Sequence, residues 1–147
     1  MFKTLEKKRW LSVLLFVLIA IQIFWISSLS QKSISIPSQT FQLKSTIYHF
    51  CVFFLFAFFL IASIKNKKEI TKKMIIIVLI VSLSYAILDE IHQSFVLGRY
   101  PSFDDVIIDS LGIIISTFIY FKTSKKLSLI SEKNHAHKVK EELLSKK

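Results

Sequence analysis

Four long apolar segments are the feature that most constrains the fold of this chain. They occupy residues 10–29, 47–64, 74–91 and 106–121, and each is close to the roughly 20 residues that cross the core of a bilayer, the fourth being short. The chain is 52% hydrophobic, and these residues are grouped in blocks instead of alternating with polar ones as in a soluble domain. Backbone inside a bilayer must satisfy its own hydrogen bonds, so each segment is expected to be helical. The sequence therefore predicts an all-α, four-helix, multi-pass transmembrane bundle.

The positions of the basic residues predict the orientation of this bundle. Seventeen Lys and Arg residues lie before the first span, in the link between the second and third spans, or in the tail after the fourth. The loops on the other side hold three, which are Lys32, Lys44 and Arg99. Basic loops remain in the cytoplasm, so we expect a protein of the cell membrane with both termini cytoplasmic. Nucleic acid is not an expected partner, because the sequence offers no soluble basic face or aromatic platform.

Three regions follow from this reading: a basic cytoplasmic N-terminus at residues 1–9, a four-span membrane domain at residues 10–121, and a lysine-rich cytoplasmic tail at residues 122–147. The tail is compatible with a helix on the anionic inner membrane surface or with a solvated, partly disordered segment. The first span has a rival interpretation as a signal peptide, since KKR precedes it and SLS resembles a cleavage site. Two tryptophans frame its long apolar stretch, which favours an uncleaved anchor.

With this topology, the polar residues in and beside the spans fall at one depth, near the outer face. An ionised side chain below the membrane surface is costly unless it is paired or hydrated. We therefore expect these residues to gather in a common site. They are Ser27 and Ser28 in the first span, His49 in the second, Asp89, Glu90, His92 and Gln93 in the third, Arg99 in the next loop, and Asp105 and Asp109 in the fourth.

Helical spacing places several of these residues on shared faces. Asp89 precedes His92 by three residues and Gln93 by four, so the three side chains are expected on one side of their helix. On the fourth span, polar or small residues recur at steps of four, three and four: Asp105, Asp109, Gly112 and Ser116. We expect these two stripes to face each other, with the glycine allowing close approach of a neighbouring helix.

The link LGRYPS between the third and fourth spans is typical of a tight reversal, because Gly98 allows a positive φ and Pro101 restricts the residue before it. Arg99 is well suited to a bidentate pair with a carboxylate such as Asp105. One interpretation of the whole group is structural, with ion pairs and a helix cap closing the loop. The other is functional, because ionisable residues within membrane spans are candidates for function.

The stretch DEIHQSFVLGRYPSFDDVIIDSLG resembles the signature of VanZ-like membrane proteins, in which Asp-Glu-x-His-Gln is followed by Gly-Arg, then Asp, then Asn or Asp, then Gly. FWISSLSQ resembles the Ser-Ser end of that family's first span, and YHFCVFF resembles its histidine-bearing second span. The likeness covers residues 22–121. Three positions depart from the family pattern: Thr46 stands where Lys is frequent, Asp109 where Asn is frequent, and Leu97 where Pro is usual.

The resemblance implies a multi-pass membrane fold and a role at the cell envelope. VanZ-like proteins are associated with resistance to lipoglycopeptide antibiotics such as teicoplanin. Two classes of function remain open. The first is an envelope accessory or binding protein that holds a membrane lipid, a lipid head group or a lipoglycopeptide. The second is a small membrane enzyme that acts on phosphate-bearing lipid head groups by acid–base or divalent-metal chemistry. Transport is a lesser alternative and would need an oligomer.

The candidate site residues serve either class. The candidate catalytic residues are His49, Asp89, Glu90, His92, Arg99 and Asp105. The candidate substrate-binding residues are Gln93, Arg99, Asp109, Ser27 and Ser28. Their oxygen and nitrogen donors, without any thiolate, suit a divalent ion such as Mg²⁺, Mn²⁺ or Zn²⁺. The sequence does not identify the cofactor.

Overall fold

A computed structural model describes residues 9–30, 38–65, 70–99 and 101–144 of the chain. This part of the chain forms four helices and no strand, which confirms the predicted all-α bundle. Each helix is apolar and long enough to cross a membrane. The helices are α2 (Arg9–Ser27), α3 (Ser38–Ile64), α4 (Lys72–Ser94) and α5 (Phe103–Leu144). Residues 1–8 of the predicted basic N-terminus lie outside the described residues.

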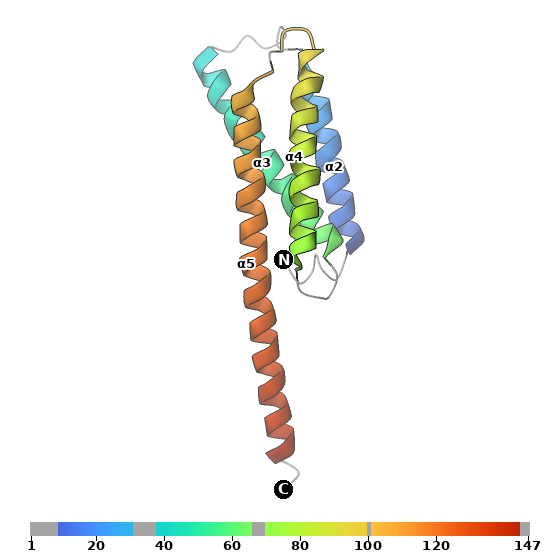
Figure 1. Ribbon diagram of the computed structural model, residues 1–147, viewed down its shortest axis with the longest axis vertical. Coiled ribbons are helices and arrows are strands. Elements are labelled where there is room, and N and C mark those ends of the chain that lie inside the picture. The colour runs from blue at the N-terminus through green and yellow to red at the C-terminus, as the bar shows by residue number, and fades with distance from the viewer. Residues whose placement is uncertain (1–8, 31–37, 66–69, 100, 145–147) are drawn as a thin grey trace.

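The helix α3 crosses the bundle obliquely, while α2 and α4 run side by side and α5 stands beside them (Figure 1). The most extensive contacts of α3 are with α5 and α2, and α3 is the most buried of the four helices. The other helices expose large apolar side chains such as Trp25 of α2, Ile80 of α4 and Phe118 of α5. A helix that is apolar on all sides is stable where lipid covers its outer face.

Aromatic side chains join three of the helices in the middle of the bundle. The ring of Tyr85 on α4 stacks on Phe56 of α3, with 4.8 Å between centroids. The Tyr85 hydroxyl donates a hydrogen bond to the carbonyl of Ala20 on α2, at 2.7 Å. A tyrosine in an apolar interior needs such a polar partner. This side chain therefore connects α2, α3 and α4.

The helix α5 packs on α3 through Gly112. A Cβ atom at this position would lie 2.6 Å from the Phe50 carbonyl oxygen and 3.2 Å from the Phe54 nitrogen. The expected close approach at Gly112 is confirmed, but the neighbour is α3 and not the polar stripe of α4. Small residues allow such backbone contact between membrane helices. Gly112 is consequently turned toward α3.

Two helices are longer than their apolar segments predict. The helix α3 begins at Ser38 instead of residue 47, and α5 begins at Phe103 instead of residue 106 and continues to Leu144. With 42 residues, α5 is about 63 Å long, twice the roughly 30 Å bilayer core. Figure 1 shows it projecting well beyond the other helices. The described part of the lysine-rich tail is therefore a straight continuation of α5.

Local signals at the ends of α4 match the sequence. The Thr71 side chain accepts a hydrogen bond from the Met74 nitrogen at 3.3 Å and caps the first turn. After α4 ends, Gly98 has a φ of 82°, which confirms the positive φ expected in the reversal. The chain then enters α5 directly after Ser102, so the start of α5 is held close to the end of α4.

Candidate functional site

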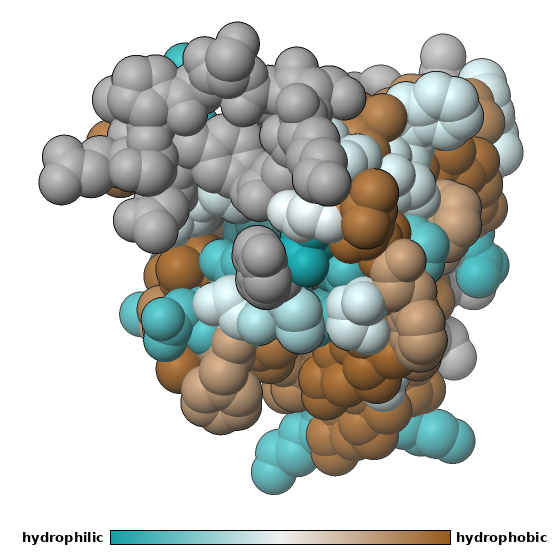
Figure 2. Space-filling view, turned by 90° about the horizontal axis from the view of Figure 1, so that it is seen from above, coloured by the Kyte–Doolittle hydropathy of each residue, from teal (hydrophilic) through white to brown (hydrophobic). Residues whose placement is uncertain are grey.

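The carboxyl ends of α2 and α4 and the amino ends of α3 and α5 meet at one end of the bundle, at the top of Figure 1. Figure 2 looks onto this end and shows hydrophilic residues in its centre, beside brown apolar side chains. The candidate residues from the sequence analysis lie in the halves of these helices nearest this end, directly after α2, or in the loop between α4 and α5. The contacts between them form three groups, of which the first two share Glu90, while Arg99 contacts main-chain oxygens.

The first group centres on His49 of α3 and Asp109 of α5. The imidazole Nδ1 lies 3.2 Å from Asp109 Oδ1 and 3.4 Å from Oδ2. The side chains are 4% and 0% exposed, so water does not screen this contact. The ring of His49 also stacks on Phe53, with 6.5 Å between centroids. A buried carboxylate is costly without such a partner, and the pair holds the imidazole in one orientation.

Glu90 of α4 and Asp105 of α5 complete this group. One ligand-type atom from each of His49, Glu90 and Asp105 lies within 4.8 Å of the other two. The Glu90 Oε2 atom accepts a hydrogen bond from the Ser102 nitrogen at 2.8 Å, immediately before α5. An N–H at this position has no partner within its own helix. Glu90 therefore ties the end of α4 to the start of α5 while it faces His49.

The second group joins α4 to α2 through the amide of Gln93. Its Nε2 atom donates to Asp89 Oδ2 at 3.0 Å and lies 3.5 Å from both Glu90 Oε1 and Ser27 Oγ. All four residues are buried. The expectation that Asp89 and Gln93 share a face is confirmed by their contact. This amide links the carboxylates of α4 to the last residue of α2.

The third group lies on the contact between α4 and α2. The Nε2 atom of His92 is 2.9 Å from Ser28 Oγ, and its ring stacks on Phe24 at 4.6 Å. Asp89 contacts Gln93, whose amide lies 3.5 Å from Ser27 Oγ at the end of α2, while His92 contacts the next residue, Ser28. The two histidines therefore contact different partners.

Arg99 contacts main-chain oxygens and not the carboxylate that we expected. Its Nη2 atom donates to the Ile26 carbonyl at 2.8 Å and its Nε atom to the Leu29 carbonyl at 3.2 Å. The Ile26 carbonyl belongs to the last turn of α2, where the helix has its negative dipole end, and the Leu29 carbonyl follows the helix. Arg99 is thus a cap on α2. The predicted bidentate pair between Arg99 and Asp105 is therefore wrong.

Tyr48 is a residue that the sequence reasoning missed. Its buried hydroxyl has no hydrogen-bond partner within the described part of the chain, and it is close enough to Asp89, Arg99 and Asp109 to interact with them electrostatically. The sequence did contain a signal for this residue: it is a tyrosine next to the candidate histidine, at the polar end of an apolar segment.

The composition of the site favours a cation. Four carboxylates lie within a membrane bundle, three of them beside His49, and Arg99 is held by carbonyls at its edge. Imidazole and carboxylate are common ligands of Zn²⁺ and Mn²⁺. A metal-binding histidine usually donates its other N–H to a carboxylate, which is the relation that Asp109 has to His49. The carboxylates are Asp89, Glu90, Asp105 and Asp109.

A family model described as VanZ/LLP1 matches residues 4–126 of the chain. The match includes all four apolar segments and every candidate residue described above. No curated protein and no solved structure matches the chain.

Proposed function

The chain belongs to the VanZ/LLP1 family of membrane proteins, and on that premise we propose that it is a binding protein of the cell envelope. Its binding site is the group formed by His49, Glu90, Asp105 and Asp109, which faces outward in the orientation that the basic loops favour. The site holds a divalent cation, and the cation holds the phosphate of a lipid head group.

The observation that carries this proposal is the proximity of three metal-type donors from three helices, with 4.8 Å as the largest separation among the ligand atoms of His49, Glu90 and Asp105. Purely structural ion pairs would bring each carboxylate to a cation of the protein. Here the acids outnumber the cationic side chains, so the carboxylates are not all matched by a cation of the protein. Buried charge of this kind needs compensation, and a divalent cation supplies it.

The same charge balance indicates how the phosphate of the ligand is bound. A bare phosphate would be repelled by Glu90 and Asp105, and Arg99 already donates to the carbonyls of Ile26 and Leu29. A divalent ion attracts both partners and can bridge protein carboxylates to a phosphate oxygen. A metal-bridged head group therefore fits the site better than a head group clamped by Arg99.

The test uses dihexanoyl phosphatidic acid, a short-chain lipid with a phosphate monoester, and the purified full chain in detergent. Binding is measured by calorimetry with 1:1 Mg²⁺ or Mn²⁺ and again with excess EDTA. The expected result is binding that needs the ion and is lost in Asp105→Asn. The matched control is Asp104→Asn, because the neighbouring Asp104 is exposed. Binding that persists in EDTA, or that fails equally in both variants, would contradict the proposal.

A link to antibiotic resistance is a further part of the proposal, taken from the association of VanZ-like proteins with teicoplanin-type compounds. The expected result is a lower susceptibility to teicoplanin in cells that express the chain than in cells that express Asp105→Asn at the same membrane level. Equal susceptibility in the two strains would remove this part and leave the ion-binding site untouched.

A second candidate function is an enzyme that removes phosphate from the same kind of lipid. The contact between His49 and Asp109 supports it, because a carboxylate that orients an imidazole is a recurrent arrangement for a general base. In this reaction His49 would take a proton from water as the water oxygen bonds to phosphorus. The bond from phosphorus to the lipid oxygen would break, and the proton would pass to that oxygen. Release of inorganic phosphate from dihexanoyl phosphatidic acid, absent in His49→Gln, would support the enzyme over the binding protein.

A further inference from the structure

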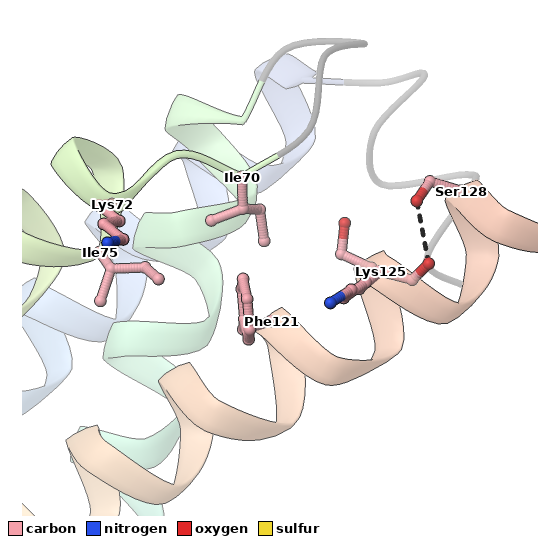
Figure 3. Close-up of a pocket in the computed structure, with 7 residues that line it drawn as sticks. Ile70, Lys72, Ile75, Phe121, Lys125 and Ser128 are labelled. Carbon is pink, nitrogen blue, oxygen red and sulfur yellow. Dashed lines mark hydrogen bonds between the residues drawn. The ribbon is translucent and has the colours of Figure 1, made fainter.

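A pocket lies at the end of the bundle opposite to His49, between the start of α4 and the middle of α5 (Figure 3). It has a volume of about 470 Å³, which is in the range of small-ligand sites. Its apolar wall consists of Ile70 and Ile75 on the α4 side and Phe121 on α5. Figure 3 shows Ile70 and Phe121 facing each other, so the pocket has an apolar interior.

The rest of the lining is basic or hydroxylic. Lys72 and Lys125 line the pocket with Ser124, and no carboxylate is among its described lining residues. The buried Lys65 donates a hydrogen bond from Nζ to Ser124 Oγ at 2.7 Å, which places a third ammonium beside the pocket. The first turn of α4 begins at Lys72, and the N–H groups of a helix amino end favour anions. The pocket is therefore positive on one side and apolar on the other.

This pocket also lies at the level where the apolar parts of both helices end. The apolar segment of α4 starts just after Lys72 and Lys73. The apolar segment of α5 stops at Phe121, and lysines follow at 122, 125 and 126. Such a transition marks the boundary between lipid chains and head groups. A ligand in this pocket would have its polar end in the head-group region and its apolar end toward the bundle.

We propose that the pocket binds an anionic glycerophospholipid. Its phosphate contacts Lys72 and Lys125, and the upper part of an acyl chain lies along Ile75 and Phe121. Basic pockets between membrane helices are suited to this ligand because they match its charge at the correct depth. The inference is independent of the function proposed for the opposite end, because it needs neither a divalent ion nor His49.

The experiment titrates the purified full chain in a non-ionic detergent with dioleoyl phosphatidylglycerol and counts bound lipids by native mass spectrometry. EDTA is present throughout, which separates this pocket from the cation site around His49. Dioleoyl phosphatidylcholine is the uncharged comparison. We expect Lys72→Gln/Lys125→Gln to weaken the binding of phosphatidylglycerol about tenfold or more, since each lysine near a lipid surface contributes about a factor of five.

The matched control is Lys122→Gln/Lys126→Gln, which removes two positive charges from exposed positions of α5 outside the pocket. We expect this control to bind phosphatidylglycerol within about twofold of the unaltered chain, since its lysines are further from the phosphate. Equal weakening in both double variants would overturn the proposal, because it would reflect overall charge alone. Equal binding of phosphatidylcholine, or of glycerol 3-phosphate without acyl chains, would overturn it as well.

Discussion

His49 of α3 and Asp109 of α5 are 60 positions apart in the sequence and meet inside the bundle, with 3.2 Å between Nδ1 and Oδ1. Both side chains are buried, with exposed fractions of 4% and 0%, so water does not take the place of either hydrogen-bond partner. A polar group that loses its buried partner keeps the full cost of its desolvation. The pair therefore links the packing of α3 on α5 to the arrangement of the site.

A double-mutant cycle measures this link. We expect His49→Ala and Asp109→Ala each to lower the free energy of unfolding, and the double variant to lose about 1 kcal/mol less than the sum of the two. Each single variant leaves one buried polar group without its partner, whereas the double variant leaves none. The measurement is unfolding by sodium dodecyl sulfate in mixed micelles. Effects that add within about 0.5 kcal/mol would show that the two residues act independently.

Gly112 tests the close approach of α3 and α5. We expect Gly112→Ala to lower the free energy of unfolding by about 1–3 kcal/mol, the usual cost of overpacking, because its Cβ would lie 2.6 Å from the Phe50 carbonyl oxygen. The same unfolding measurement applies. Leu111→Ala is the control, since this neighbouring side chain is exposed on the outer face. A stable Gly112→Ala protein would mean that the two helices are further apart than described.

Arg99 separates a structural contact from a ligand contact. We expect Arg99→Gln to lower the free energy of unfolding by about 1–2 kcal/mol, because the hydrogen bonds to the Ile26 and Leu29 carbonyls are lost. Its affinity for Mn²⁺ should stay within about twofold of the unaltered chain, since the guanidinium contacts no metal-type donor of the site. Calorimetry with Mn²⁺ alone checks the second part. Loss of ion affinity in a folded Arg99→Gln protein would place Arg99 in the binding site.

The orientation of the bundle is testable with the single cysteine at position 51. In a Cys51→Ser background, we expect Phe95→Cys to react with a membrane-impermeant maleimide added to intact cells. Lys126→Cys should react only after the cells are broken, because the basic end of the bundle stays in the cytoplasm. Both side chains are exposed, so burial does not confuse the result. The reverse labelling pattern would place the His49 site in the cytoplasm.

The sequence predicts the four helices well because membrane spans are identified by length and hydropathy alone. It also predicts that polar residues from all four helices share one end of the bundle. Consecutive spans cross the membrane in opposite directions, so the carboxyl ends of the first and third spans lie on the same side as the amino ends of the second and fourth. Gly112 was identified as a contact point from its place in the stripe on α5. These predictions depend on spacing along one helix, which a single sequence contains.

The contacts that each candidate side chain makes were harder to predict, because these contacts depend on how the helices are arranged around one another. Spacing did not reveal that Gly112 faces α3, or that His92 turns toward Ser28. The partner of Arg99 was missed because every helix end offers carbonyl acceptors that leave no mark in the sequence. The extra turns of α3 and the long extension of α5 were missed because their residues are polar and lack a hydrophobic signal.

The most direct test of the account is the binding of Mn²⁺ to the purified chain, followed by electron paramagnetic resonance of the free ion. We predict one tight site per chain, with affinity about 10–100-fold lower in Asp109→Asn, which loses the carboxylate that orients His49. Asp105→Asn should bind at least as weakly, and Asp104→Asn should bind like the unaltered chain. An unaltered, folded chain that leaves all the Mn²⁺ free, or an Asp105→Asn variant that binds as well as Asp104→Asn, would contradict the account.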